Sequence, residues 1–166
     1  PIGTGILATA LKRGLLLPED LKNAISVMTE LNTLGTSLSE HEEVHAMTDI
    51  TGFGLLGHLI EMCEGSGVSA ELDFKKIPLI DNLKHYTDQF ILPDSVYRNW
   101  NAFEKKVSGI SGPAFMPLCD PQTSGGLLVS VDPEFAMKIK EYSLLFLNPI
   151  GRVINQIEAT VVVNEE

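Results

Sequence analysis

The sequence is poor in cysteine, in positive charge and in long apolar runs, and each shortage excludes a class of protein. Cys63 and Cys119 stand far apart and outside any C-x-x-C pattern, which excludes a disulfide scaffold and is typical of reduced thiols in a cytoplasmic protein. The sequence has 12 Lys and Arg against 22 Asp and Glu, which gives a formal net charge of −10, and it contains no basic cluster. Nucleic acids and anionic membranes would therefore be repelled. No apolar run approaches the ~20 residues of a membrane span. We therefore expect a cytoplasmic protein that binds neither nucleic acid nor membrane.

What is present predicts one globular domain over residues 1–166. The chain has 166 residues, 44% of them hydrophobic, which is long enough to bury a core. It opens Pro-Ile-Gly-Thr-Gly without an initiator Met, so we expect a piece of a longer protein. Expected strands and helices alternate in an irregular order, which favours an α/β (α+β type) layered domain with a mixed sheet covered by helices.

Apolar periodicity and turn residues place the expected elements. A capping box at Ser39 and Glu42 predicts a brief helix before the first strand. A helix is expected from Pro133 to about Phe146, and two strands after it predict a closing hairpin. The expected strands cover residues 44–50, 68–74, 127–131, 150–155 and 158–163, and the best-defined helices begin at Pro18 and Gly54.

The segment Ala46–His58 joins a strand, a carboxylate, a glycine-rich turn and the start of an apolar helix. Backbone amides at such a turn attract phosphate. Asp49 would repel phosphate unless a cation lies between them, and Mg²⁺ is a cation that carboxylates and phosphates share. We therefore predict a metal–phosphate site with Asp49 as metal ligand and with Thr48, Gly52 and Gly54 among the cofactor-binding residues. One carboxylate is too few to hold the metal alone.

The same residues match the dinucleotide fingerprint G-x-G-x-x-G at Gly52, Gly54 and Gly57, with Asp73 at the end of the next strand. We reject this interpretation because Asp49 would face the pyrophosphate without a metal. At an effective dielectric of ~20, two like charges ~4 Å apart cost about 4 kcal/mol. The preceding strand is also more polar than the buried first strand of such folds.

A second segment, Leu118–Leu128, reads Leu-Cys-Asp-Pro-Gln-Thr-Ser-Gly-Gly-Leu-Leu. Thr123 and Ser124, with the two glycines after them, can form a nest of amides and hydroxyls suited to an anion. Both segments also have a purely structural interpretation. The first would be a tight strand-to-helix connection capped by Asp49 or Thr51, and the second an ordinary loop.

Catalytic side chains are not indicated in this chain. Ser124 stands in no G-x-S-x-G nucleophile elbow. The histidines, His41, His45, His58 and His85, lack metal-ligand spacing, so packing or surface roles are expected for them. Cys119 is interpreted as a small buried residue rather than as a reactive thiol.

Together the two segments resemble the C-terminal half of the selenophosphate synthetase (selenide, water dikinase) family. The opening Pro1–Leu7 and the pair Arg98-Asn99 are further matches, so the resemblance covers essentially the whole chain. It implies a fold like the C-terminal domain of aminoimidazole ribonucleotide synthetase. It also implies the conversion of ATP, selenide and water into selenophosphate, AMP and orthophosphate with Mg²⁺.

The resemblance further implies a two-domain subunit in a homodimer. Its N-terminal domain, absent from this sequence, would supply the catalytic Cys or selenocysteine, a Lys and most of the metal-binding aspartates, and Asp49 matches the aspartate from this half. Alone, the chain is expected to be inactive. Two other functions stay open at this point: a stand-alone module that binds Mg-ATP or a dinucleotide, and a structural dimerisation domain.

Overall fold

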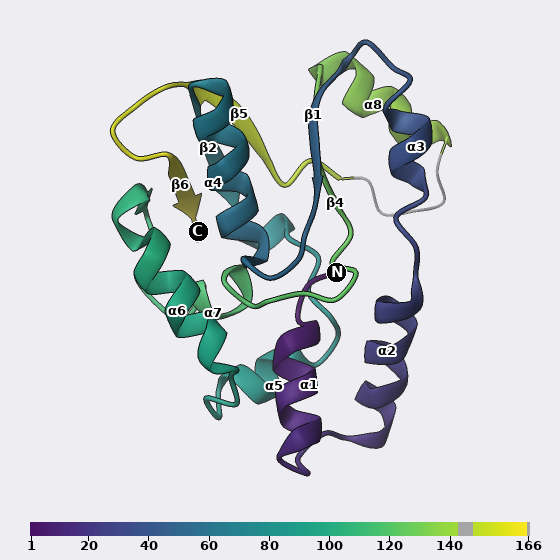
Figure 1. The fold of residues 1–166 in the computed structure, drawn as a ribbon, viewed down its shortest axis with the longest axis vertical. Helices are drawn as coiled ribbons and strands as arrows, with labels where there is room; N and C mark the ends of the chain where they lie inside the picture. The colour runs from purple at the N-terminus through teal and green to yellow at the C-terminus, as the bar shows by residue number, and fades with distance from the viewer. Residues whose placement is uncertain (143–147, 166) are drawn as a thin grey trace.

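The computed structural model describes residues 1–142 and 148–165, in which helices and strands alternate irregularly (Figure 1). The strands are β1 (Val44–Asp49), β2 (Val68–Asp73), β3 (Val107–Ser108), β4 (Leu127–Val131), β5 (Gly151–Asn155) and β6 (Val161–Asn164). The α-helices are α1 (Thr4–Lys12), α2 (Pro18–Thr29), α3 (Leu34–Leu38), α4 (Gly54–Ser66), α5 (Leu83–Thr87), α6 (Asp94–Phe103), α7 (Phe115–Leu118) and α8 (Pro133–Tyr142), and short 3₁₀ turns cover Phe74–Lys76 and Glu104–Lys106. No helix of the described part is long and apolar enough to cross a membrane.

The strands form a four-stranded mixed sheet and a separate two-stranded ribbon. In the larger sheet, of order β3-β6-β2-β5, strand β2 is antiparallel to β5 and parallel to β6, and β3 is parallel to β6. The ribbon pairs β1 with β4 in antiparallel register. The mixed sheet with its covering helices confirms the predicted fold class, and the separate ribbon is an addition to it.

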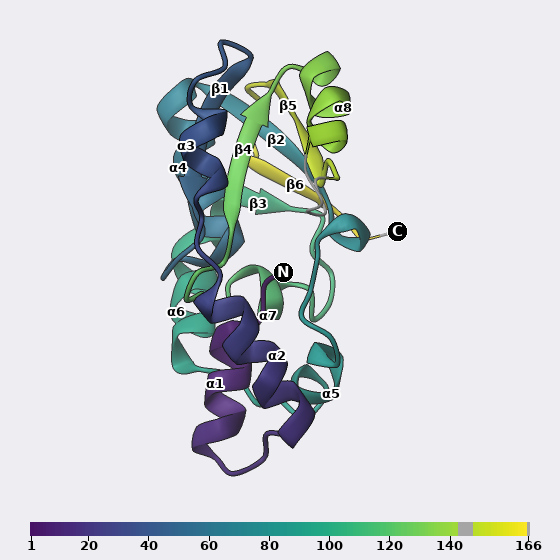
Figure 2. The same cartoon turned by 90° about the vertical axis from the view of Figure 1, so that its right-hand side faces the viewer.

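Helix α4 occupies the centre of the molecule because it is apolar on several sides. It packs against β2 and β6 of the sheet, against α6 and α7, and against β1 of the ribbon. Figure 2 shows α4 and α6 on one side of the sheet and the ribbon standing beside them. Its residues from Gly54 to Ile60 are all buried. The helix therefore joins the ribbon to the sheet through one continuous core.

Helices α1, α2 and α5 pack together below the sheets in the view of Figure 1. Pro18 opens α2 at its first position, with two acidic residues in the first turn, as the sequence predicts. A buried polar contact fixes this end of the helix, because the Tyr86 hydroxyl donates to Asp20 Oδ2 at 2.5 Å and accepts from the Leu17 amide at 3.1 Å.

Two local predictions are wrong. The two strands at the C-terminal end do not form a hairpin, because β2 lies between β5 and β6 and pairs with both. The capping-box helix at Ser39 is also absent from the described residues: the short helix α3 ends just before it, and the Ser39 hydroxyl donates to the Thr36 carbonyl at 2.8 Å. The predicted end of the helix that starts at Pro133 lies outside the described residues, since α8 is described to Tyr142.

Candidate functional site

The ribbon brings the two predicted segments together. Asp49 pairs with Leu127 in the register of β1 and β4, and the antiparallel contact continues past the strand ends. The Ile50 amide donates to the Gly126 carbonyl at 3.0 Å, and the Gln122 amide donates to the Thr51 carbonyl at 2.9 Å. The turn after Asp49 and the loop before Leu127 therefore lie side by side, although they are more than 70 positions apart in the chain.

Asn99 of α6 fastens these two loops to each other. Its side-chain Nδ2 donates to the Gly52 carbonyl at 3.0 Å and to the Cys119 carbonyl at 2.9 Å. The side-chain amide has two hydrogens, so both are used. Because Asn99 is buried, water competes little with these bonds, and they hold the two loops close to each other.

The N-terminal segment joins the same place through Gln122. The Gln122 Oε1 atom accepts from the Gly3 amide at 2.9 Å, the Thr4 amide at 3.1 Å and the Thr4 hydroxyl at 3.1 Å. The Thr4 hydroxyl oxygen in turn accepts from the Thr123 amide at 2.9 Å. Four segments that the sequence analysis singled out thus meet at one position.

Asp120 is a buried carboxyl at the centre of this meeting point. Its Oδ2 atom accepts from the Gly5 amide at 3.0 Å and from Gln122 Nε2 at 2.8 Å. Its Oδ1 atom is buried and has no hydrogen-bond partner among the described residues. Burial raises the pKa of Asp120 to about 7, and the hydrogen bonds from Gln122, Ile6 and Gly5 oppose that rise only partly.

Asp49 and its neighbours occupy the solvent-facing side of this assembly. The Asp49 side chain is exposed, and within the described residues no hydrogen bond or ion pair from its carboxylate is found. Gly52 is exposed, and a Cβ built on it would meet nothing within 4 Å. The Thr48 hydroxyl bonds only locally, to the Asp49 carbonyl at 3.3 Å. The carboxylate and the glycine turn are therefore free to face a ligand.

The two hydroxyl residues of the second segment behave differently from each other. Thr123 is exposed, with its amide held by Thr4. Ser124 has a left-handed backbone, with φ of 55°, and its hydroxyl donates to the Glu30 carbonyl at 2.5 Å. That bond ties the second segment to the end of α2.

The structure explains Gly54 and Gly57 by packing. Gly54 has φ of +72°, and a Cβ on it would lie 2.7 Å from the Leu118 carbonyl oxygen and 3.0 Å from that of Asp120. A Cβ on Gly57 would lie 2.6 Å from the Phe103 ring. Gly54 is buried, so it would not contact a bound cofactor directly. Its role is to let α4 begin in close contact with the second segment.

The fold also removes the dinucleotide interpretation. That fingerprint belongs to a βαβ unit whose two strands lie parallel in one sheet. Here β1 belongs to the ribbon and β2 to the four-stranded sheet, so α4 connects two different sheets. The capping interpretation fails as well, since Phe53 is the N-cap residue of α4 and no side chain caps this helix end. Thr51 instead shares a hydrogen bond of 3.0 Å with His58 Nε2.

A complete metal centre is not found in this part of the chain. Among residues 1–142 and 148–165, no three His, Cys, Asp or Glu side chains come close enough to hold a metal ion together. Asp49 therefore offers one carboxylate ligand at most. A Mg²⁺ ion at Asp49 would need further ligands from outside these residues.

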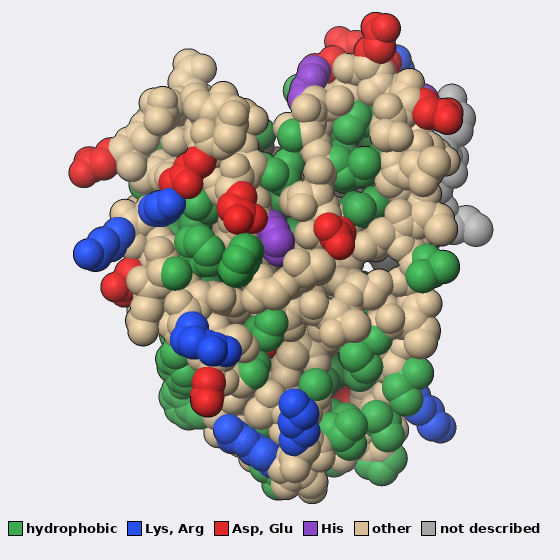
Figure 3. All heavy atoms as spheres, in the orientation of Figure 1, with side chains coloured by type: hydrophobic (Ala, Val, Ile, Leu, Met, Phe, Trp, Pro, Cys, Tyr) green, Lys and Arg blue, Asp and Glu red, His purple; other side chains and the backbone are tan. Residues whose placement is uncertain are grey.

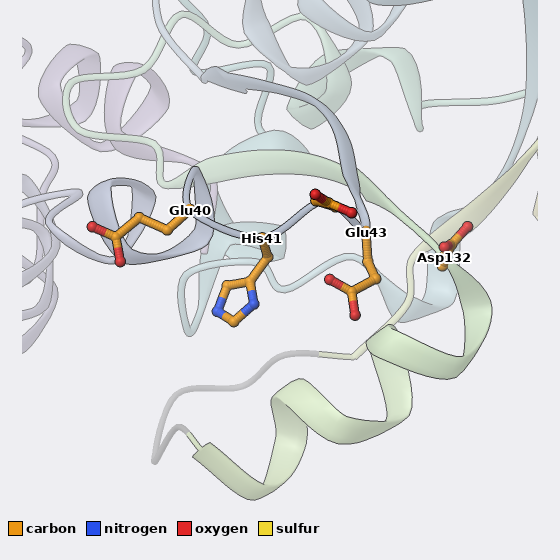
Figure 4. Close-up of a pocket in the computed structure, with 5 residues that line it drawn as sticks. Glu40, His41, Glu43 and Asp132 are labelled. Atoms are coloured by element: carbon orange, nitrogen blue, oxygen red, sulfur yellow. The ribbon is translucent and has the colours of Figure 1, made fainter.

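An open acidic hollow lies at the other end of the ribbon. A pocket of about 550 Å³ is lined by Glu40, His41, Glu42, Glu43 and Asp132, and Figure 4 shows these side chains around the start of β1 and of α8. Asp132 is paired there with His45 Nε2 at 2.9 Å. Four carboxylates without a Lys or Arg in the lining would repel phosphate. On the face drawn in Figure 3, Lys and Arg lie mainly over the lower left part.

Three residues with structural roles in the site, Asn99, Asp120 and Gln122, were missed as site residues by sequence reasoning. Each stands inside a segment that the sequence analysis quoted, but each acts through contacts 20 to 119 positions away. One local signal was available for Asp120, which directly follows the buried pair Leu118 and Cys119. A carboxyl placed in such an apolar run has to be satisfied internally.

Comparison with known proteins gives the chain its relatives. Residues 1–164 match the family described as AIR synthase related protein, C-terminal domain. The selenide, water dikinase of Aeromonas hydrophila is 47% identical over 156 residues, covering 92% of this chain and 45% of its own length. That of Colwellia psychrerythraea is 46% identical over 165 residues, covering 97% of this chain and 48% of its own length. These identities confirm the resemblance drawn from the two segments. The chain spans about half the length of the curated relatives it matches.

Solved structures support the same fold. A thiamine-monophosphate kinase from Stenotrophomonas maltophilia superposes with a TM-score of 0.65 at 16% sequence identity, covering 99% of this chain and 48% of that one. A chain of a HypE–HypF complex superposes with a TM-score of 0.60, also at 16% identity, covering 99% and 46%. At such identities the likeness concerns the fold alone. Because residues 1–164 match its model, the chain belongs to the family of AIR synthase related proteins, C-terminal domain.

Proposed function

We propose that this chain is the C-terminal half of a selenide, water dikinase, which makes selenophosphate, AMP and orthophosphate from ATP, selenide and water. The two relatives of that name described above are 46–47% identical to this chain and about twice as long. An N-terminal ATP-binding domain would precede residue 1 and supply the catalytic groups, and the whole protein would form a homodimer. In this proposal residues 1–166 form one domain, and the protein is cytoplasmic.

The observation that carries the proposal is the convergence of the four matched segments on the Asp49 turn. The turn offers an exposed carboxylate and an open glycine. In the described residues, no hydrogen bond from the amides of Thr51, Gly52 and Phe53 is found. Such amides beside a carboxylate suit a phosphate whose charge is shared with a cation.

In this proposal Asp49 provides one ligand for Mg²⁺, and the nucleotide phosphates and the preceding domain provide the others. Mg²⁺ would neutralise phosphate charge during the transfer reaction. The turn amides would orient phosphate oxygens, with Thr48, Gly52, Thr123 and Ser124 lining the same surface and Gly54 setting the turn against its support. The exposure of the turn supports this division, because a surface that faces another domain of the same polypeptide is open when that domain is absent.

The test is Asp49→Asn in the full-length protein, assayed as selenide-dependent AMP formation at several Mg²⁺ concentrations. Loss of a charged ligand should lower kcat/KM about hundredfold, or about 2.7 kcal/mol of transition-state stabilisation. Asp81→Asn is the matched control, because Asp81 is also exposed and lies on the loop before α5. Equal activity of the two variants would show that Asp49 does not serve the reaction and would favour a structural domain.

The isolated 166-residue chain provides the second arm of the test. It should form no AMP from ATP and selenide, because the groups expected to perform the chemistry precede it. Selenide-dependent AMP formation by the isolated chain would contradict the proposed division of the site. Tight binding of Mg-ATP without turnover, measured by calorimetry, would instead favour a stand-alone nucleotide-binding module.

A further inference from the structure

We propose that Asp120 and Gln122 form a latch that holds the N-terminal segment Gly3–Gly5 against the loop beside Asp49, and that Asp120 is a positioning residue of the candidate nucleotide site. This inference rests on the proposed function for its catalytic consequence. The latch itself is carried by contacts within the chain. It gives a role to a buried carboxyl that the proposed chemistry does not use.

The latch is a closed set of hydrogen bonds around one side-chain amide. Gln122 Oε1 accepts three hydrogen bonds from Gly3 and Thr4, while Nε2 donates to the Asp120 carbonyl at 2.7 Å and to Asp120 Oδ2 at 2.8 Å. The orientation of the Gln122 amide is thereby fixed, since its oxygen faces only donors and its nitrogen only acceptors. Any other side chain at this position would leave several buried polar groups unsatisfied.

The latch reaches the Asp49 turn through the Gln122 backbone. The Gln122 amide donates to the Thr51 carbonyl, and the next amide, of Thr123, donates to the Thr4 hydroxyl. Thr51 lies between Asp49 and the exposed Gly52. The position of the turn therefore depends on whether Gly3–Gly5 is held, and in the longer relatives the preceding half would lead into this segment.

The chemical state of Asp120 decides whether the latch closes. Its Oδ1 atom is buried without a partner and faces Gly5 so closely that a Cβ there would lie 2.6 Å away. The facing groups are uncharged: the backbone amides of Gly5 and Ile6 and the side-chain amide of Gln122, with the Cys119 thiol as the titratable neighbour. A neutral carboxyl suits these buried surroundings, whereas an ionised one would be a buried charge that the three donors offset only in part. The raised pKa of about 7 agrees with this geometry.

Hydrogen exchange in the 166-residue chain tests the latch without any assay of activity. We expect the protection of the Gly3, Thr4 and Gly5 amides, corrected for intrinsic exchange, to fall by up to about tenfold per pH unit above pH 7. Asp120→Asn keeps one acceptor oxygen that can take the place of Asp120 Oδ2 but cannot ionise, so the protection of these amides should stay constant from pH 6 to 8. Asp81→Asn should behave like the unchanged chain. Constant protection in the unchanged chain would overturn the proposal.

Kinetics of the full-length protein test the positioning role. Asp120→Ala should raise KM for ATP about tenfold at pH 6.5, because the acceptor for Gly5 and Gln122 is lost. Asp120→Asn should restore the original KM and remove its increase with pH above 7. If Asp120→Ala fails to fold, the comparison of Asp120→Asn with the unchanged protein still decides. A KM that rises with pH equally in both would contradict the proposal.

The two experiments fail separately. A protein with pH-dependent protection but without dikinase activity would retain the latch and disprove the proposed function. A protein with dikinase activity but with pH-independent protection of Gly3–Gly5 would retain the proposed function and disprove the latch.

Discussion

Replacing Gly54 by alanine should lower the free energy of unfolding of this protein, whereas the same change at Gly52, two positions earlier, should not. Gly54 has a left-handed backbone, with φ of +72°, and an added Cβ would lie 2.7 Å from the Leu118 carbonyl oxygen and 2.8 Å from the Cys119 carbonyl carbon. These are backbone atoms, so they cannot turn aside as a flexible side chain would. At Gly52 the backbone is not left-handed, and the added Cβ would meet nothing within 4 Å.

The magnitude follows from two penalties at Gly54. A non-glycine residue in the left-handed region costs roughly 1–2 kcal/mol, and forcing a methyl group into a filled space costs typically 1–3 kcal/mol. Gly54→Ala should therefore lower the free energy of unfolding by about 3 kcal/mol. Gly52→Ala should change it by less than about 1 kcal/mol, in the stabilising direction, because alanine restricts the unfolded chain.

Urea unfolding of the 166-residue chain, followed by circular dichroism, measures both variants against the unchanged chain. In thermal unfolding, 3 kcal/mol corresponds to a decrease in Tm of about 6–12 °C for a chain of this size. Equal stability of the two variants would refute the packing role of Gly54. The pair also separates fold from function, since Gly52→Ala should weaken ATP binding in the full-length protein while leaving stability intact.

Two further predictions concern the buried titratable groups around the site. Asp120 has a folded-state pKa of about 7 and a reference value of 3.8, so between these values the folded state binds more protons than the unfolded state. The contribution of Asp120 to the free energy of unfolding should therefore fall as pH rises from 4 to 7, by up to about 4 kcal/mol. Urea titrations of the unchanged chain and of Asp120→Asn at several pH values should show this as a difference in stability that changes with pH. A difference that is independent of pH would contradict the prediction. Burial, with Asp120 beside it, raises the pKa of Cys119 to about 12, and burial also raises that of Cys63. Both thiols should therefore resist a disulfide reagent at pH 8 in the folded chain and react at once in urea, whereas rapid modification of the folded chain would show that the packing around them opens.

Local sequence patterns predicted the elements whose formation depends on their own residues. The strands β1, β2 and β4 and the helix α4 appear close to their predicted ranges, because alternation, apolar content and glycine breaks are local properties. The closing hairpin failed for a long-range reason. Two consecutive strands with a short connection satisfy the hairpin pattern, but nothing near them in the sequence shows that β2, some 80 positions earlier, pairs with both.

The candidate site divides in the same way. The Asp49 turn could be found from its own letters, since a carboxylate beside a glycine turn has a chemical meaning at short range. Asn99 and Gln122 carry side chains whose partners are 20 to 119 positions away. Neither composition nor spacing assigns such partners, so their roles required the fold. The charge argument against a dinucleotide agreed with the later finding that β1 and β2 lie in different sheets.

The hydrogen bonds between Gln122 and the residues Gly3 and Thr4 join distant parts of the chain, which are synthesised at different times. They span 118 and 119 positions, and contacts that close so long a loop cost more conformational entropy than contacts within a local helix. On a ribosome the Asp49 turn is synthesised long before Gln122, so it waits without its support until the last third of the chain has emerged. A phosphate-binding loop held by its own neighbours would be ready at once. Here the turn gains this support only when segments 118 and 119 positions apart in the chain have met.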